Sequence, residues 1–206
     1  MFPLAASITA AVMLAAYLIG SIPTGVLVTR LFTGHDIRRV GSGNIGATNV
    51  RRAAGNLPGA MVLLGDMFKG LAPVYLVMRL PMFADEGRWG AVCVALTAFA
   101  AFLGHLYPIY SKGRGGGKGV ATAAGCFLPI SPVVLVGPVL IFILVVWRRR
   151  IVSLGSLAAA AALPVCALLQ NGSLVYTALG AAMVAFIFMR HSGNIRRLRD
   201  GTEPKI

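Results

Sequence analysis

Charged residues are scarce in this chain, and long stretches have none at all. Asp, Glu, Lys and Arg make up 12% of the 206 residues, and 57% of the residues are hydrophobic. Soluble domains average roughly 25% charged residues. The composition therefore indicates a membrane protein rather than a soluble domain.

Basic residues are missing from the start of the chain, where the first Lys or Arg is Arg30. A secretory signal peptide begins with a basic region, so we expect the opening apolar run to be a membrane span that is retained. Cysteine is also rare. Cys93, Cys126 and Cys166 each lie in an apolar run without paired spacing, which argues against a disulfide framework and against a metal site.

Acidic residues are the rarest charges, six against 19 Lys and Arg, and the formal net charge is +13. In a soluble chain this excess would suggest a nucleic-acid partner. Here the basic residues lie in short loops between apolar runs, where membrane topology and anionic lipid account for them. We therefore expect a membrane lipid environment and no nucleic acid.

Uncharged runs of about 20 residues are long enough to cross a bilayer. The sequence predicts spans at Phe2–Thr29, Leu57–Leu80, Trp89–Tyr110, Ile151–Gln170 and Leu174–Met189. Gly20, Pro23 and Gly25 are expected to bend the second half of the first span. The uncharged run 119–147 is too long for one span and contains Pro129 and Pro132, so we expect two short helices in a hairpin.

The distribution of Lys and Arg supports that hairpin. With it, the loops 30–52, 112–118 and 148–150 and the tail 190–205 share one side and hold sixteen basic residues. The positive-inside rule then predicts an all-α polytopic protein with about seven transmembrane helices, its N-terminus outside and its C-terminus in the cytoplasm.

Three polar segments fall on the cytoplasmic side in this topology. The first, residues 41–52, reads GSGNIGATNVRR, whose glycines allow turns that aim N–H groups at an anion and whose Ser42 and Asn44 add short donors. The second, residues 105–122, contains GRGGGKGV and runs directly into a helix whose amino end favours phosphate. It is not a Walker A loop, because no Ser or Thr follows Lys118.

The third polar segment, residues 190–203, follows the last span and carries His191, Asn194 and several arginines. A charged pair lies elsewhere, inside the second span. Asp66 and Lys69 are three residues apart and share a helix face, where opposite charges need each other or a polar cavity. We expect this pair to support the site rather than to react.

The segments GSGNIGATNVRR, GGGKGVAT and HSGNIRRLRDGTE, with GDMFKG and RRRIVSLGS between them, resemble the bacterial acyl-phosphate:glycerol-3-phosphate acyltransferase (PlsY) family. The resemblance spans nearly the whole chain and keeps the motifs in the family's order. The second motif departs from it: the family commonly reads Phe-Lys-Gly-Gly-Lys-Gly, whereas this chain has Arg114 and Gly115 at the first two places.

The resemblance implies one integral membrane acyltransferase domain over residues 1–206, in the bacterial plasma (inner) membrane with its site on the cytoplasmic side. It implies transfer of a fatty acyl group from acyl phosphate to the 1-hydroxyl of sn-glycerol 3-phosphate. The products are lysophosphatidic acid and phosphate, at the start of phospholipid biosynthesis. The sequence leaves the acyl-chain preference and the oligomeric state open, a monomer included.

Such a site mainly has to hold and neutralise two phosphates, and an activated donor needs neither a cofactor nor a metal. The resemblance implies that glycerol 3-phosphate is bound by Ser42, Arg52, His191 and Asn194. We expect Asn44, Gly116, Gly117, Lys118 and Gly119 to bind substrate as well. Asp66, Lys69 and Glu203 are expected to support them. His191 has two open roles, general base and ligand, and we favour the ligand because a substrate phosphate dianion can itself receive the hydroxyl proton.

Two other classes of protein fit part of the pattern. A small polytopic transporter of anions or phosphate esters would also need a basic, glycine-rich site, but its mark is a midplane site between repeated halves, and we find no convincing repeat. A structural subunit of a membrane complex would bind no small molecule. No His is followed five places later by Asp, which disfavours an acyl-CoA enzyme of the soluble type.

Single cysteines at positions 113 and 149, in a chain without its native cysteines, test the predicted sidedness. We expect a membrane-impermeant thiol reagent to label both from the cytoplasmic face, because the run between them turns back. Labelling from opposite faces would show that the run crosses the membrane once and would remove the argument for a shared cytoplasmic site.

Overall fold

The computed structural model describes residues 2–83 and 88–206, and every regular element in these stretches is helical. Met1 and residues 84–87, the latter in the predicted loop between the second and third spans, lie outside them. The α-helices are α1 (Phe2–Gly20), α2 (Thr24–Thr33), α3 (Ala47–Ala54), α4 (Asn56–Met78), α5 (Arg88–Leu106), α6 (Val120–Ile130), α7 (Val136–Arg149), α8 (Val152–Asn171), α9 (Leu174–Arg190) and α10 (Ser192–Arg199). The 3-10 helices are η1 (Ile37–Arg39), η2 (Ile109–Ser111) and η3 (Pro132–Leu135). The predicted all-α class is confirmed.

Five stretches of the described residues are long and apolar enough to cross a membrane. They are Ser7–Thr33, Asn56–Met78, Trp89–Ser111, Pro132–Arg149 and Val152–Gln170. A sixth arises if α9 and α10, which are bent by 63° relative to each other, count as one span. Each predicted span is thus helical, whereas the count of seven and the sidedness stay predictions.

The long uncharged run 119–147 forms two helices, as predicted. α6 ends at Ile130, and the chain resumes in η3 with Pro132 in the first turn before continuing as α7. α6 has only 11 residues. At about 1.5 Å per residue it reaches roughly 16 Å, well short of an apolar core of about 30 Å. The hairpin arrangement of the two helices stays a prediction.

The chain divides into two compact units, Met1–Ile130 and Ser131–Ile206, here called unit 1 and unit 2. The boundary falls at the break between α6 and η3. Unit 1 contains the first and second polar segments, and unit 2 contains the third. Each unit is described by itself, and the single domain expected from the sequence stays a prediction.

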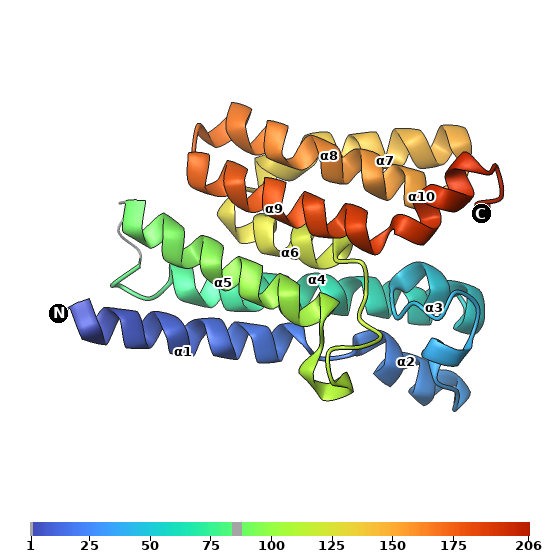
Figure 1. The fold of residues 1–206 in the computed structure, drawn as a ribbon, viewed down its shortest axis with the longest axis horizontal. Coiled ribbons are helices and arrows are strands. Elements are labelled where there is room, and N and C mark those ends of the chain that lie inside the picture. The colour runs from blue at the N-terminus through green and yellow to red at the C-terminus, as the bar shows by residue number, and fades with distance from the viewer. Residues whose placement is uncertain (1, 84–87) are drawn as a thin grey trace. The chain divides into compact units, whose positions relative to one another are not determined.

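In unit 1, α1 and α5 run side by side and in the same direction (Figure 1). Thr9 Oγ1 lies 3.6 Å from Cys93 Sγ near their beginnings, and a Cβ added at Gly20 would overlap the backbone of Ala101 near their ends. Small residues permit this close approach of two helices. The chain therefore leaves α1 and α5 at the same end of unit 1.

The predicted bend in the first span is a complete break. α1 ends at Gly20 and α2 begins at Thr24, after Pro23. Pro has no N–H and restricts the residue before it, so a helix does not pass through this position unstrained. The break leaves backbone groups at residues 21–23 that need other partners.

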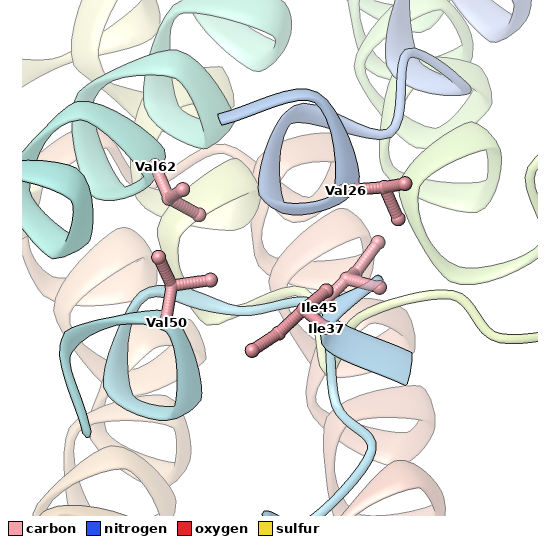
Figure 2. Close-up of a cluster of buried hydrophobic side chains, with 5 residues drawn as sticks. All are labelled: Val26, Ile37, Ile45, Val50 and Val62. Atoms are coloured by element: carbon pink, nitrogen blue, oxygen red, sulfur yellow. The ribbon is translucent and has the colours of Figure 1, made fainter. Parts of the chain in front are cut away.

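An apolar cluster fixes the first polar segment to the helices around it. Figure 2 shows Val26 of α2, Ile37, Ile45, Val50 of α3 and Val62 of α4, all of which are buried together. The apolar side chains at 37, 45 and 50 thus hold a mostly polar stretch of chain against α2 and α4. The segment is anchored on both sides of its glycines.

α4 and α6 pack through glycines. A Cβ added at Gly70 of α4 would overlap the carbonyl oxygen of Thr122, and one at Gly125 of α6 would overlap that of Met67. The two helix backbones therefore touch where α6 begins. This contact fixes the amino end of α6, where the glycine-rich segment enters it.

In unit 2, α8 packs against both α7 and α9, and α10 continues from α9 after the 63° bend. The C-terminal residues fold back on this unit. The N–H of Ile206 donates to the carbonyl oxygen of Arg150 at 2.8 Å, just beyond the end of α7. The third polar segment, which contains α10, thus continues into a tail that returns to the end of α7.

Candidate active site

A buried amide organises the first polar segment. The side chain of Asn49 accepts from the N–H of Ser42 at 3.1 Å and donates to the carbonyl oxygens of Val40 at 3.0 Å and Asn44 at 2.9 Å. These bonds close residues 40–44 into a compact turn on the first turn of α3. Asn49, a residue of the GSGNIGATNVRR segment, thus has a structural role that the sequence did not reveal.

The predicted ligands of this segment lie in different surroundings. Ser42 is exposed at the tip of the turn, and Arg52 is exposed on α3. Asn44 is half-buried, and its Oδ1 accepts from the N–H of Gly46 at 2.8 Å, so this oxygen shapes the turn. The binding roles of Ser42, Asn44 and Arg52 stay predictions.

Asp36 lies shortly before the first polar segment and forms hydrogen bonds with two arginines. Its carboxylate accepts from Nε of Arg38 at 3.0 Å and from Nη2 of Arg30 at 3.1 Å. The hydrogen bond from Arg38 is the main cause that holds the pKa of Asp36 well below its ordinary value. A Cβ added at Gly115 would lie 3.2 Å from Cδ of Arg38, so the arginine side chain also packs against the second polar segment.

The glycine-rich loop lies directly on the end of α5. The N–H of Gly117 donates to the carbonyl oxygen of His105 at 3.1 Å. A Cβ added at Gly116 would overlap the carbonyl oxygen of Leu106. Gly119 has a φ of +88°, which favours glycine, and it faces the ring of Phe102. Close packing and backbone geometry together require these glycines.

The loop delivers a cation to a helix amino end. Lys118 is half-buried, and α6 begins two residues later at Val120. The first turn of α6 contains the buried hydroxyl of Thr122. A helix amino end with a neighbouring ammonium group is suited to bind a phosphate.

A buried cluster of polar side chains lies beneath this loop. Asp66 and Lys69 of α4 form the expected salt bridge, with 2.8 Å between Nζ and Oδ1. The hydroxyl of Thr24 donates to the same Oδ1, and Lys69 also donates to the carbonyl oxygen of Ile22 at 3.0 Å. Lys69 therefore satisfies a backbone group left by the break between α1 and α2.

His105 completes the cluster, and sequence reasoning missed it. Its Nδ1 lies 3.5 Å from Oδ1 of Asp66, and both side chains are 3% exposed. The sequence signal for such a role is a histidine within the apolar run Trp89–Tyr110. It lies four residues before Ile109, which is exposed at the end of that run. Sequence spacing on one helix cannot reveal a contact between α4 and α5.

In unit 2, Glu203 organises the third polar segment. Its Oε1 accepts from Ser153 of α8 at 2.7 Å and from Nδ2 of Asn194 at 2.6 Å, and its Oε2 accepts from Nε of Arg197 at 2.7 Å. These contacts join α8, α10 and the C-terminal tail at one carboxylate. The supporting role expected for Glu203 in substrate binding stays a prediction.

His191 lies at the bend between α9 and α10. Its Nδ1 lies 2.8 Å from the carbonyl oxygen of Ile187, and the residue is 2% exposed. Asn194 is also buried, and it lies beyond the 63° bend that separates α9 from α10. The binding roles of His191 and Asn194 stay predictions, as do those of residues 116–119.

Glu203 is expected to make the stability of unit 2 depend on pH. Burial alone would raise the pKa of Glu203, but hydrogen bonds from Ser153, Asn194 and Arg197 and the charge of Arg197 together lower it. A carboxylate with a lowered folded pKa stabilises the fold above its ordinary pKa of about 4.3. That stabilisation is lost as the pH falls through the folded pKa.

The variant Glu203→Gln should lower the free energy of unfolding by about 1 kcal/mol or more at pH 7, because hydrogen bonds to a charged group are replaced by neutral ones. The difference in Tm between the parent and this variant should shrink as the pH falls below about 4.3. Thermal unfolding in detergent at several pH values measures it. Asp200→Asn is the control, because Asp200 is exposed and 3.9 Å from Arg196. If the difference in Tm between the parent and Glu203→Gln is the same at every pH, the prediction is contradicted.

Comparison with known proteins covers nearly the whole chain. Residues 10–201 match the family model described as glycerol-3-phosphate acyltransferase. The chain is 49% identical over 191 residues to the glycerol-3-phosphate acyltransferase of Syntrophotalea carbinolica, covering 93% of this chain and 94% of that one. It is 51% identical over 190 residues to that of Geobacter sulfurreducens, covering 91% and 92%.

Two solved structures are similar to this one. They are the glycerol 3-phosphate form and the lysophosphatidic acid form of PlsY (YgiH), an integral membrane glycerol 3-phosphate acyltransferase. The TM-scores are 0.88 and 0.85, at 33% and 31% identity, and each comparison covers 96% of this chain and 95% of the other. The chain is an integral membrane protein and belongs to the glycerol-3-phosphate acyltransferase family.

Proposed function

We propose that the protein transfers a fatty acyl group from an acyl phosphate to the 1-hydroxyl of sn-glycerol 3-phosphate. The observation that carries the proposal is similarity over 96% of the chain to an enzyme solved in its glycerol 3-phosphate form. The products would be lysophosphatidic acid and inorganic phosphate. The reaction would take place at the cytoplasmic face of the bacterial inner membrane.

The chemistry needs no covalent intermediate. The glycerol hydroxyl oxygen attacks the acyl carbonyl carbon, an ester bond forms, and the bond between that carbon and the phosphate oxygen breaks. The phosphate leaves with the electron pair, and the hydroxyl proton ends on it as hydrogen phosphate. The protein's contribution is to bind two anions close together and to stabilise the charge that moves to the leaving group.

The glycine-rich loop is the best-supported site for the donor's phosphate. The closely packed residues 116–119 lead into the amino end of α6, and Lys118 adds a cation there. Backbone N–H groups and a helix amino end favour a phosphate group without requiring a metal ion. The acyl chain of the donor would lie along the apolar helices.

The acceptor's phosphate and hydroxyls are assigned to Ser42, Arg52, His191 and Asn194. Arginine suits a phosphate because its guanidinium can form two parallel hydrogen bonds with it. Ser42 and Arg52 are exposed around the turn that Asn49 closes. Asn194 of α10 donates a hydrogen bond to Glu203, and His191 lies at the bend just before α10 begins.

Purified protein in detergent, given palmitoyl phosphate and glycerol 3-phosphate, should release lysophosphatidic acid and phosphate in equal amounts. Lys118→Ala should lower kcat/KM by about tenfold to a hundredfold, because a charged hydrogen bond contributes roughly 1.5 to 3 kcal/mol. Product formation is measured with radiolabelled glycerol 3-phosphate.

Lys112→Gln is the matched control for this experiment, because Lys112 is an exposed cation of the same segment. It should keep kcat/KM within about threefold of the parent value. Equal losses in both variants would point to a general effect of charge rather than to a phosphate ligand. Product formed from palmitoyl-CoA but not from palmitoyl phosphate would overturn the proposed donor.

His191→Gln tests the ligand role of His191 against that of a general base. Glutamine keeps a hydrogen-bond donor near the same place, so a ligand role predicts a raised KM for glycerol 3-phosphate with kcat within about tenfold. A general base contributes about 10² to 10⁴ in rate. A loss of kcat beyond a thousandfold at saturating acceptor, together with loss of an acidic limb near pH 6.5 in the rate profile, would make His191 the base.

A further inference from the structure

His105 is a buried titratable residue to which the proposed reaction assigns no role. It lies near the end of α5, and its side chain is 3% exposed. One edge of its ring faces Asp66 of α4, and the other faces Gly117 of the glycine-rich loop. The imidazole therefore links the buried cluster to the loop proposed to hold the donor's phosphate.

On the cluster side, three groups from three parts of unit 1 meet Oδ1 of Asp66. They are the hydroxyl of Thr24, Nζ of Lys69 and Nδ1 of His105. A carboxylate inside an apolar helix is costly unless charge and hydrogen bonds compensate it, so these contacts hold one another in place. The imidazole thus lies next to this carboxylate of α4, with 3.5 Å between Nδ1 and Oδ1.

On the loop side, the same residue makes two kinds of contact. Its carbonyl oxygen accepts from the N–H of Gly117 at 3.1 Å. A Cβ added at Gly117 would overlap Nε2 and Cε1 of the ring, so the loop backbone lies directly against the imidazole. The ring therefore restricts the position of Gly117, and the backbone carbonyl groups of His105 and Leu106 restrict that of Gly116.

We propose that His105, held by Asp66, is a positioning residue that sets the backbone of Gly116–Gly117 for binding of the donor's phosphate. The inference rests on the proposed function, because it takes this loop to be the donor site. Misplacement of about 1 Å at a reacting centre can lower the rate by about a hundredfold. Loss of the ring should therefore weaken the use of acyl phosphate more than that of glycerol 3-phosphate.

His105→Asn separates the two sides of the ring. The asparagine amide can take the place of Nδ1 beside Asp66, but nothing replaces the part of the ring that lies against Gly117. We expect the KM for palmitoyl phosphate to rise by about tenfold or more and the KM for glycerol 3-phosphate to stay within about threefold. Similar changes in both constants would reduce His105 to a general structural role and overturn the inference.

Lys69→Gln is the matched control within the cluster. Lys69 contacts Asp66 and the carbonyl oxygen of Ile22, at the break between α1 and α2. This variant should lower Tm and should raise the KM for palmitoyl phosphate by less than His105→Asn does, because the ring of His105 still lies against Gly117. If it raises that KM as much as His105→Asn does, then disturbance of the cluster, not of the ring, explains the effect.

A double-mutant cycle tests the contact between the ring and Gly117. Gly117→Ala alone should lower kcat/KM for palmitoyl phosphate by a hundredfold or more, because its methyl group would collide with the imidazole. In the His105→Ala background, the same substitution should cost less than about tenfold, because the space is open. Additive losses would show that the ring does not determine the position of Gly117.

Hydrogen exchange gives a readout that does not depend on turnover. In His105→Asn, the amides of residues 112–119 should exchange faster than in the parent, whereas those of α4 should be unchanged. Equal exchange in the loop would overturn the inference even if the parent is fully active. Absence of lysophosphatidic acid from the parent would instead reject the proposed function, and the exchange result would still decide whether His105 holds the loop.

Discussion

Neutralising the carboxylate of Asp66 inside an apolar helix is the constraint on which unit 1 depends. The groups that meet this carboxylate come from the start of α2, from α4 itself and from the end of α5. Lys69 additionally binds the carbonyl oxygen of Ile22, so the same cluster satisfies the backbone at the break between α1 and α2. One buried charge thus couples the break in the first span to the end of the third, where the glycine-rich loop begins.

A second carboxylate has the corresponding place in unit 2, but its surroundings differ. Glu203 lies in the C-terminal tail, outside the apolar helices, and binds Ser153, Asn194 and Arg197. The charge of Asp66 is compensated by groups on packed helices, whereas Glu203 accepts hydrogen bonds from residues on α8 and α10. In each unit an acidic side chain that is not itself a predicted ligand thus contacts residues of, or next to, a polar segment.

Composition, charge distribution and the positions of Gly and Pro were sufficient to predict the helical class, the apolar runs, a bend near Pro23 and the interruption near Pro132. Spacing along one helix was sufficient for the pair Asp66–Lys69. Contacts between helices were not accessible: nothing along the chain brings His105 to Asp66. The short helix α3 was missed because its residues, rich in polar side chains and preceded by glycines, favour a turn until Val50 packs into the apolar cluster.

The few acidic residues also explain how the polar segments stay basic. Within residues 2–83 and 88–206 the acidic side chains are Asp36, Asp66, Asp200 and Glu203, and each forms an ion pair with a basic partner close by in the sequence. Each of these ion pairs therefore stabilises its own stretch of backbone. The 19 basic residues of the chain still outnumber the six acidic ones, and an excess of positive charge near a membrane surface attracts phosphate-bearing substrates.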